Sequence, residues 1–401
     1  MKFRLQIVLL LLPFWGFSQG GITFFTGKVL DKDSLSPIAT AYISIPSTGF
    51  NAACNTNGEF KFSFPKINLD SEVVVSAVGY KNFKQKARAF DSTNVISLQA
   101  EQQAISAAGM DAKELVKTAL DLVKKNYPIF PIYQHGFYLE TIDLEQVGFV
   151  KINEAAIRIE RFPNQKDSPD KTKLLKARKY EWKGQTSKLD NWGFENGAAV
   201  VTRSLETSTP DYLDKGGLND YNFVYDSVST VFDDKPVTVI AFSPVNSRVR
   251  AARIGKIYID QETNAIIKIA YEMTPEGVKD IMKSSALSNT KKDGKAIKAY
   301  TQYRSFNGVW YLIDSYLSFS ADFEGKLDTK YKNTANMNLR YVANESLKLV
   351  RPSINEVQQL MSTNNFPNGG IAYETRVWGA SSCLIPTEEM QKIIENIRGK
   401  R

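Results

Sequence analysis

The sequence predicts a mainly β protein of the α+β kind. An amino-terminal Greek-key β-sandwich is followed by a larger, curved, open antiparallel sheet with a few packing helices. Short segments in which apolar and polar residues alternate recur along most of the 401 residues, and this alternation is typical of half-buried strands. Turn residues separate these segments at short intervals, and short links between consecutive strands favour antiparallel pairing.

The first part of the chain carries the pattern of a sandwich. Asn57 and Gly58 both tolerate positive φ, which a type I′ hairpin turn requires. After them Phe60, Phe62 and Phe64 alternate with polar residues, so one face of that strand is apolar. A later run of three valines is apolar on both faces and fits an interior strand. Several short strands with turns between them predict two packed sheets.

The order and spacing of these motifs resemble a known family. The motifs are Thr26-Gly27-Lys28-Val29-Leu30-Asp31, Pro37-Ile38, Ala41-Tyr42-Ile43, Asn55-Thr56-Asn57-Gly58-Glu59-Phe60 and Ser76-Ala77-Val78-Gly79-Tyr80-Lys81. Together they resemble the carboxypeptidase-regulatory-like β-sandwich, a transthyretin-like module of cell-envelope proteins of Bacteroidetes. The resemblance implies an accessory domain over residues 22–100 and implies no activity for the whole protein.

A second domain is expected over residues 111–401, after a polar, alanine-rich linker at 101–110. Asp111 and Glu114 form a capping pair that begins a helix, which ends near Pro128. Hairpins then follow one another, so the sheet should be an antiparallel meander. The expected strands are 137–142, 147–159, 174–182, 222–231, 237–242, 255–260, 265–273, 296–306 and 309–319, and a last helix spans 387–397.

Part of this second domain resembles another family. The run from Gly255 to Asp260, then Thr263 and 265–269, followed by 307–312, is similar to the strand repeats of LolA-type lipoprotein carriers. Those proteins curve an open sheet around an apolar groove. The resemblance therefore implies a concave face that could hold an apolar ligand.

The first residues predict export. Residues 1–19 combine a basic start at Lys2 and Arg4, a short apolar run and a Pro-Phe-Trp-Gly break, which is the pattern of a secretory signal peptide. We therefore expect a protein of the periplasm, the outer membrane or the cell exterior. The formal charge of +8 would favour acidic surfaces and peripheral contact with a membrane, but a solvated surface is the favoured explanation for a mild excess spread along the chain. Export and the lack of a binding motif argue against nucleic acid.

The rare residues exclude several chemistries. His135 is the only histidine, whereas an H-E-x-x-H zinc site needs two, and no G-x-S-x-G motif supplies a nucleophilic serine. Cys54 and Cys383 are too few for a thiolate cluster. An oxidising compartment would permit a disulfide between them, but the sequence leaves open whether they lie close enough. We expect no metal, no cofactor and no catalytic residue.

Carboxylates keep one enzymatic alternative open. A glycoside hydrolase needs only two of them at the right separation, and acidic residues are plentiful. Those on expected strands and turns are Glu140, Asp143, Glu154, Glu160 and the pair Asp233-Asp234. None has a distinguishing sequence context, and turn aspartates commonly accept bonds from nearby backbone groups.

Aromatic residues of the second domain are the candidate ligand-binding residues. Trp182, Trp192, Trp310 and Tyr311 could form a stacking platform for sugar rings or the lining of a lipid groove. Core packing is the competing interpretation, and it is favoured for Trp310 on its alternating strand. Trp192 lies among polar residues and glycine, in an expected loop.

The sequence thus predicts an exported, non-enzymatic cell-envelope protein. Its second domain would bind an apolar or lipid ligand, a glycan or an outer-membrane protein partner on a preformed concave face. One alternative is a carboxylate-dependent glycan hydrolase. The other is a structural or assembly component of an outer-membrane complex.

Overall fold

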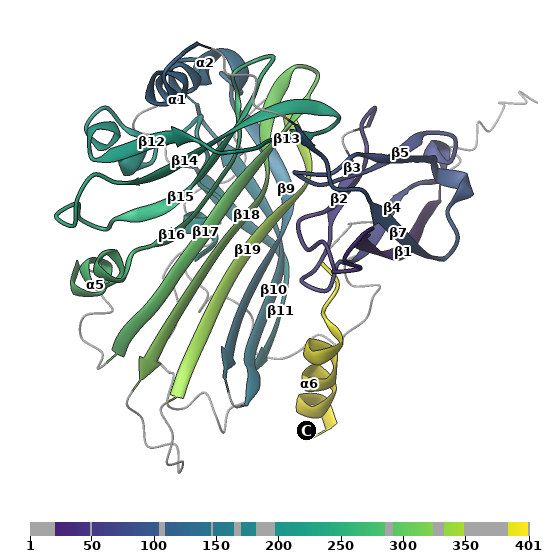
Figure 1. Cartoon of the computed structure of the whole chain (residues 1–401). Helices are drawn as coiled ribbons and strands as arrows, with labels where there is room; N and C mark the ends of the chain where they lie inside the picture. The colour runs from purple at the N-terminus through teal and green to yellow at the C-terminus, as the bar shows by residue number, and fades with distance from the viewer. Residues whose placement is uncertain are drawn as a thin grey trace, which may run out of the picture.

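The computed structural model confirms the predicted fold class (Figure 1). A small sandwich of two sheets lies beside one large antiparallel sheet, and few helices accompany them. The structure describes residues 21–48, 50–103, 109–145, 147–163, 170–181, 197–284, 292–323, 333–348 and 384–399.

Two sheets with the strand orders β4-β1-β7 and β3-β2-β5-β6 form the sandwich. The strands are β1 (Ile22–Asp31), β2 (Tyr42–Ile45), β3 (Phe50–Ala53), β4 (Glu59–Pro65), β5 (Glu72–Ser76), β6 (Phe83–Lys86) and β7 (Thr93–Leu98), with short 3-10 turns η1 (Lys66–Asn68) and η2 (Ala87–Ala89). Phe60, Phe62 and Phe64 are buried as predicted, and each meets Phe25 edge-on at 5.7–5.9 Å between ring centroids. This aromatic cluster fills the space between the sheets.

The large sheet contains twelve strands, in the order β11-β10-β9-β19-β18-β17-β16-β15-β14-β13-β8, with β12 also paired to β14. The strands are β8 (Gln102–Gln103), β9 (Ile132–Leu144), β10 (Gly148–Arg161), β11 (Lys171–Glu181), β12 (Tyr221–Tyr225), β13 (Ser229–Phe232), β14 (Lys235–Pro244), β15 (Arg253–Asp260), β16 (Ile266–Met273), β17 (Lys292–Phe306), β18 (Val309–Phe323) and β19 (Asn333–Lys348). Every pairing between them is antiparallel, as predicted.

Three details of the strands differ from the sequence predictions. The single strand expected over 222–231 is two strands, β12 and β13, because the chain leaves the sheet between Tyr225 and Ser229 and both pieces pair with β14. Strand β19 was not predicted, yet it lies between β9 and β18. The residue pair Gln102–Gln103, expected in a linker, pairs with β13 at the sheet edge.

The predicted type I′ turn at Asn57-Gly58 is wrong. Only Gly58 has a positive φ, of 73°, and β3 and β4 on either side belong to different sheets. The side-chain Oδ1 of Asn55 accepts bonds from the backbone N–H of Asn57 and of the residue after Gly58, which closes a polar loop instead. The other predicted turn of this kind is present: Asn307 and Gly308 have φ values of 50° and 79° and join β17 to β18.

Helices cover one face of the large sheet. They are α1 (Ala112–Asp121), α2 (Val123–Asn126), α4 (Gly197–Val201) and α5 (Pro275–Ser284), with the 3-10 turns η3 (Asp211–Leu213) and η4 (Gly217–Asn219), while α6 (Glu388–Gly399) lies elsewhere. The predicted cap is present, since the carboxylate of Asp111 accepts from the backbone N–H of Lys113 at 2.8 Å and of Glu114 at 3.3 Å. None of the helices that the structure describes is both long and apolar enough to cross a membrane.

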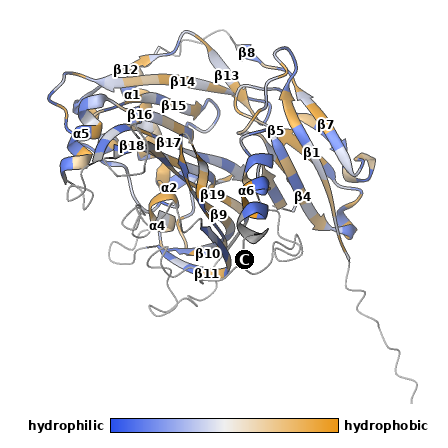
Figure 2. Ribbon diagram, turned by 90° about the horizontal axis from the view of Figure 1, so that it is seen from below, coloured by the Kyte–Doolittle hydropathy of each residue, from blue (hydrophilic) through white to orange (hydrophobic). Residues whose placement is uncertain are grey.

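Alternation along each strand gives the large sheet two different faces. Figure 2 shows the sheet curving around α1, α2 and α4, and we call this side the concave face. Leu339 and Tyr341 point into the apolar core there. The intervening Arg340 and Val342 point to the opposite, convex face, where the sandwich lies.

A buried polar cluster joins the sandwich to the convex face. Asp314 of β18 accepts a hydrogen bond from the hydroxyl of Tyr42 in the sandwich at 2.6 Å, and from Nη2 of Arg340 at 2.7 Å. Nη1 of Arg340 donates to the backbone oxygen of Cys54 at 2.8 Å. Charged side chains are rarely buried unless paired, so this cluster fixes how the two parts pack.

Cys54 itself belongs to the core of the sandwich. Burial raises the pKa of its thiol well above the ordinary value, which keeps the sulfur protonated and unreactive. Cys383 lies outside the described residues, so the disulfide between the two cysteines stays a possibility from the sequence.

The predicted domain boundaries also stay predictions.

Candidate functional site

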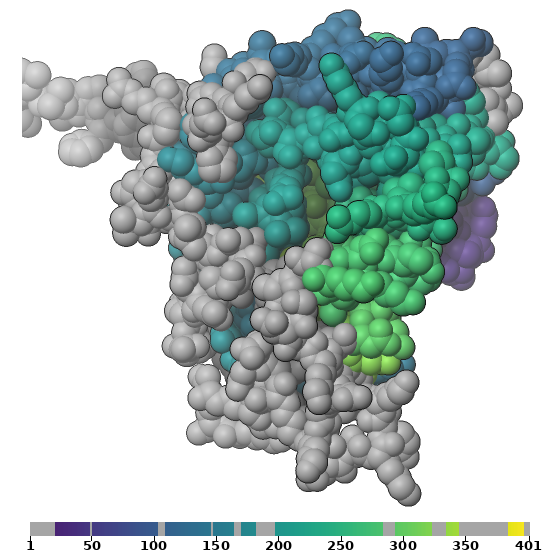
Figure 3. Space-filling model, turned by 90° about the vertical axis from the view of Figure 1, so that its left-hand side faces the viewer, coloured from purple at the N-terminus to yellow at the C-terminus, as the bar shows by residue number. Residues whose placement is uncertain are grey.

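A cavity of about 560 Å³ opens on the concave face (Figure 3). In Figure 3 the surface is hollowed between the teal segment near residue 200 and the green strands. Strands β15 to β18 form the floor of the cavity, and the segment 200–214 forms one wall. We call this cavity the groove. Its volume lies within the range of about 300–1,000 Å³ that is usual for ligand pockets.

Strand register explains why the floor is hollow. Ile269, Thr301 and Ser315 face one another across β16, β17 and β18, since Ile269 pairs with Thr301 and Thr301 with Ser315. In the next row Tyr271 pairs with Ala299, which pairs with Leu317. Side chains two residues apart share a face, so the small side chains gather at the centre of the floor and leave space above it.

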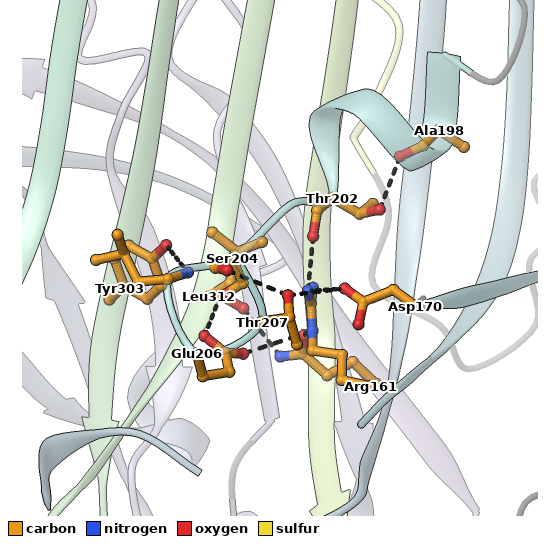
Figure 4. A network of polar contacts seen from close by, with 11 residues as sticks. Arg161, Asp170, Ala198, Thr202, Ser204, Glu206, Thr207, Tyr303 and Leu312 are labelled. Atoms are coloured by element: carbon orange, nitrogen blue, oxygen red, sulfur yellow. Dashed lines mark hydrogen bonds and ion pairs between the residues drawn. The ribbon is translucent and has the colours of Figure 1, made fainter. Parts of the chain in front are cut away.

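The wall of the groove is tied to the sheet by Arg161 of β10, which is fully buried (Figure 4). Its Nη1 donates to the backbone oxygen of Thr202 at 2.6 Å and to Asp170 at 2.9 Å, while Glu206 lies 3.7 Å from Nε. The backbone N–H of Leu205 donates to the hydroxyl of Tyr303 on the floor at 3.0 Å. One arginine therefore positions the segment that encloses the groove.

The carboxyl groups of Asp170 and Glu206, beside Arg161, have perturbed pKa values. Burial raises the pKa of both Asp170 and Glu206, and the positive charge of Arg161 opposes this effect. The hydroxyl of Ser204 also donates to Glu206. Because a buried carboxylate without a cation would be very unfavourable, Arg161 is the residue on which this network depends.

The outer end of the groove carries an arginine between two aromatic rings. The guanidinium carbon of Arg253 lies 4.6 Å from the ring centroid of Tyr212 and 5.5 Å from that of Tyr271. Its Nη2 lies 3.3 Å from Asp211, whose side chain is 71% exposed. Arg203 also lines the groove and is exposed. The lining thus combines aromatic faces, hydroxyl groups and cationic side chains.

The structure separates the predicted ligand-binding residues. Trp310 is buried in the core of the concave face. Tyr311 is half-buried and lines a small cavity of about 70 Å³ between the sandwich and the sheet, together with Arg304. Trp182 and Trp192 lie outside the described residues. Neither described member lines the groove.

The tyrosines of the groove were missed in the sequence because strand tyrosines are common and give no local signal. Three of them, Tyr212, Tyr271 and Tyr303, come from the wall and from two different strands. Only the pairing of the strands and the fixed position of the wall bring them together. A period-2 pattern could place Tyr271 and Tyr303 on a buried face, but it could not show that the face is hollow.

The acidic residues considered for hydrolysis are each held by other partners. Glu154 pairs with Arg178, Glu160 with Arg158, Asp233 with Arg304, Asp234 with Lys84, and Asp143 accepts from Asn336. None of them lines the groove. The carboxylates that do line it are Asp211, which faces Arg253, and Asp214, which accepts from the backbone N–H groups of Gly216 and Gly217.

Glu140 is also buried, and its environment predicts a pH effect. It accepts bonds from Tyr138 at 2.8 Å and Asn153 at 3.1 Å, and Lys151 lies 3.6 Å away. Burial nevertheless raises the pKa of Glu140. A carboxyl whose pKa is higher in the folded state stabilises the fold below the ordinary pKa, and that contribution is lost as pH rises through the raised value.

Glu140→Gln should therefore gain in free energy of unfolding, relative to the natural protein, as the pH rises from about 4 to about 8. Urea denaturation at both pH values measures this difference. Glu388→Gln is the control, because Lys392 lowers the pKa of exposed Glu388 and its contribution has the opposite sign. A difference for Glu140→Gln that shrinks with rising pH would contradict the assignment.

The single histidine of the chain lies in the large sheet. His135 lies on β9, with its ring centroid 5.3 Å from that of Tyr133. Within the part of the chain that the structure describes, no three His, Cys, Asp or Glu side chains are grouped to hold a metal ion.

The chain is similar to known proteins in one family and in several solved structures. Residues 25–108 match the family model of the CarboxypepD_reg-like domain. The chain carries a CarboxypepD_reg-like domain. The match confirms the family predicted from the motifs of the sandwich, and the matched residues include most of β1 and all of β2 to β7. No curated protein matches the chain significantly.

Solved structures with some likeness include a DUF1329 family protein from Desulfovibrio piger, with a TM-score of 0.25 and 8% identity over 62% of this chain and 98% of that one. Lipovitellin, in a structure concerned with lipid–protein interactions, has a TM-score of 0.26 and 8% identity over 63% of this chain and 28% of its own. At these TM-scores the likeness carries no conclusion about function.

Proposed function

We propose that this chain is an exported, non-enzymatic envelope protein whose large sheet binds a glycan in the groove. The observation that carries the proposal is the groove itself, with about 560 Å³ of space above a floor of small side chains. The CarboxypepD_reg-like domain is consistent with an envelope or binding protein. Export rests on the signal-peptide pattern of residues 1–19.

The lining favours a sugar over an acyl chain. Hydroxyl groups of Ser208, Thr209, Thr301 and Ser315 line the groove, beside the tyrosine rings. A sugar offers hydroxyl groups that can bond to these groups and apolar ring faces that can stack on tyrosine. An acyl chain would cover the same polar atoms without bonding to them, which costs free energy. Burial against a preformed surface would then supply the affinity.

The sandwich has a supporting role in this proposal. It packs on the convex face, while the groove opens on the concave face, so it contributes no residue to the groove. Its remaining surface is free to contact a partner in the outer membrane or at the cell surface. The proposed location is the periplasm, the outer membrane or the cell exterior, and the signal-peptide pattern of residues 1–19 supports it.

Binding can be tested with a glycan array and calorimetry on the natural protein and on Thr301→Trp. Thr301 is half-buried in the middle of the floor, so an indole there should fill the groove and abolish glycan binding without changing the core. Lys298→Trp, on the same strand but exposed and outside the groove, is the matched control. Retention of an acyl lipid in place of glycans, with the same sensitivity to Thr301→Trp, would overturn the proposal.

A further inference from the structure

Arg253 is a buried charged residue of the groove whose partners in the protein do not satisfy it completely. The residue is only 8% exposed, yet the nearest carboxylate belongs to the largely exposed side chain of Asp211. Its Nε atom is buried and has no hydrogen-bond partner in the part of the chain that the structure describes. Arginine has five N–H donors, and buried donors are nearly always bonded in native proteins.

The two tyrosine rings leave the guanidinium incompletely satisfied. The faces of Tyr212 and Tyr271 attract a cation and exclude water, and the side chain of Tyr271 also shares a hydrogen bond with Arg253, but none of these contacts bonds to Nε or supplies a buried carboxylate. The pKa of Arg253 is raised, because Tyr271 and Asp211 outweigh the effect of burial. The side chain of Arg253 is thus a permanent positive charge at the outer end of the groove.

From this geometry we infer that the ligand of the groove carries a carboxylate, which binds Arg253 in the position that Asp211 occupies now. The inference rests on the proposed function and names its substrate class, a glycan that contains uronic acid residues. Arginine suits such a group, since its planar fork can donate two parallel bonds to one carboxylate.

Asp211 shows that the guanidinium of Arg253 can pair with a carboxylate, and the ion pair between these two residues is weak. The carboxylate lies 3.3 Å from Nη2, at a side chain 71% exposed to water. Ion pairs in such exposed positions contribute little to stability, so a carboxylate brought by a ligand can replace Asp211 at small cost. Arg203, exposed on the same wall, adds a second positive charge that would attract an acidic ligand towards the groove.

A purely structural role for Arg253 makes a different prediction. If the side chain only fills the space between two rings, its charge is irrelevant to binding, and Asp211 has no competitor. The two variants Arg253→Met and Asp211→Asn then change affinity equally for charged and neutral ligands. Under our inference they act in opposite directions, and only on the charged ligand.

The experiment measures binding by calorimetry with a panel of neutral and uronate-containing glycans. The panel includes hexagalacturonate and the same hexamer with all its carboxyl groups methyl-esterified. Esterification removes the negative charges and adds a methyl group to each carboxyl group, while the sugar backbone stays the same. For the free acid we expect Arg253→Met to weaken binding on the order of tenfold, as for the loss of a charge-assisted hydrogen bond. Asp211→Asn should strengthen it, because the competing carboxylate is gone. The esterified hexamer should bind weakly to all variants.

Arg250→Met is the matched control, because Arg250 is exposed on a nearby loop and does not line the groove. Arg253→Lys guards against a folding defect, since it keeps the charge and loses the fork, and it should bind more weakly than the natural protein while melting alike. Equal affinity for neutral and acidic glycans, unchanged in Arg253→Met, would overturn the inference and leave the proposed function standing. If none of the glycans in the panel bound to the natural protein, both the proposed function and the inference would be overturned.

Discussion

Arg161→Met should lower the free energy of unfolding by about 3–5 kcal/mol, which is the usual cost of breaking a buried ion pair from one side. The substitution keeps most of the length of the side chain but leaves Asp170 and Glu206 buried without their cation. It also removes the donor to the backbone oxygen of Thr202. Urea denaturation, followed by tryptophan fluorescence, measures the change.

Two further variants test whether the loss of stability in Arg161→Met comes from the buried carboxyl groups. Adding Glu206→Gln to Arg161→Met should recover part of the loss, because one of the orphaned carboxyl groups becomes neutral. Lys298→Met, which removes an exposed ion pair with Glu272, should change stability by less than about 1 kcal/mol. If Arg161→Met proved as stable as Lys298→Met, the network around Arg161 would not be the support of the groove wall.

Arg340→Met should have an effect of similar size, about 3–5 kcal/mol, and should also uncouple the sandwich from the large sheet. Arg340 is the cation of buried Asp314 and the donor to the backbone oxygens of Cys54 and Ala39 in the sandwich. Without it, Asp314 keeps only the hydroxyls of Tyr42 and Tyr300. Lys268 also interacts electrostatically with Asp314, but the carboxylate would lose the only cation that is hydrogen-bonded to it among the described residues.

The uncoupling can be followed with separate probes. Residues 22–100 contain no tryptophan, so tryptophan fluorescence reports on the second domain, whereas amide hydrogen exchange reports on both. In the natural protein the two parts should unfold together, and in Arg340→Met the sandwich should exchange at its own rate. Arg88→Met, which removes an exposed pair with Asp70, is the control. Coincident transitions in Arg340→Met would refute the coupling.

The features that the sequence predicted correctly depend on interactions between residues close together in the chain. The cap at Asp111 and the turn at Asn307-Gly308 each depend on the conformational preferences of one or two residues, and both are present. Asn57-Gly58 has the same residue types as the second turn but forms no hairpin, because the strands on either side enter different sheets. Tertiary packing decided between two conformations that the same dipeptide permits.

The candidate site depends on long-range pairing, which no local feature of the sequence indicates. Thr301 and Ser315 become a floor only through the register of β16 to β18. Arg161 is bonded to an oxygen 41 residues further along the chain. The aromatic residues favoured from the sequence were chosen by type, and type does not show whether a buried face is packed or hollow.

The central place of β19 has a consequence for synthesis. Its residues, 333–348, emerge late, yet they pair with β9 at residues 132–144 and with β18 on the other side. Until they arrive, the strands on either side exist as two partial sheets with unpaired edges, which are prone to associate with other chains. Contacts between segments so distant in sequence also form slowly. A nascent chain should therefore depend on a chaperone until residues 333–348 have been made.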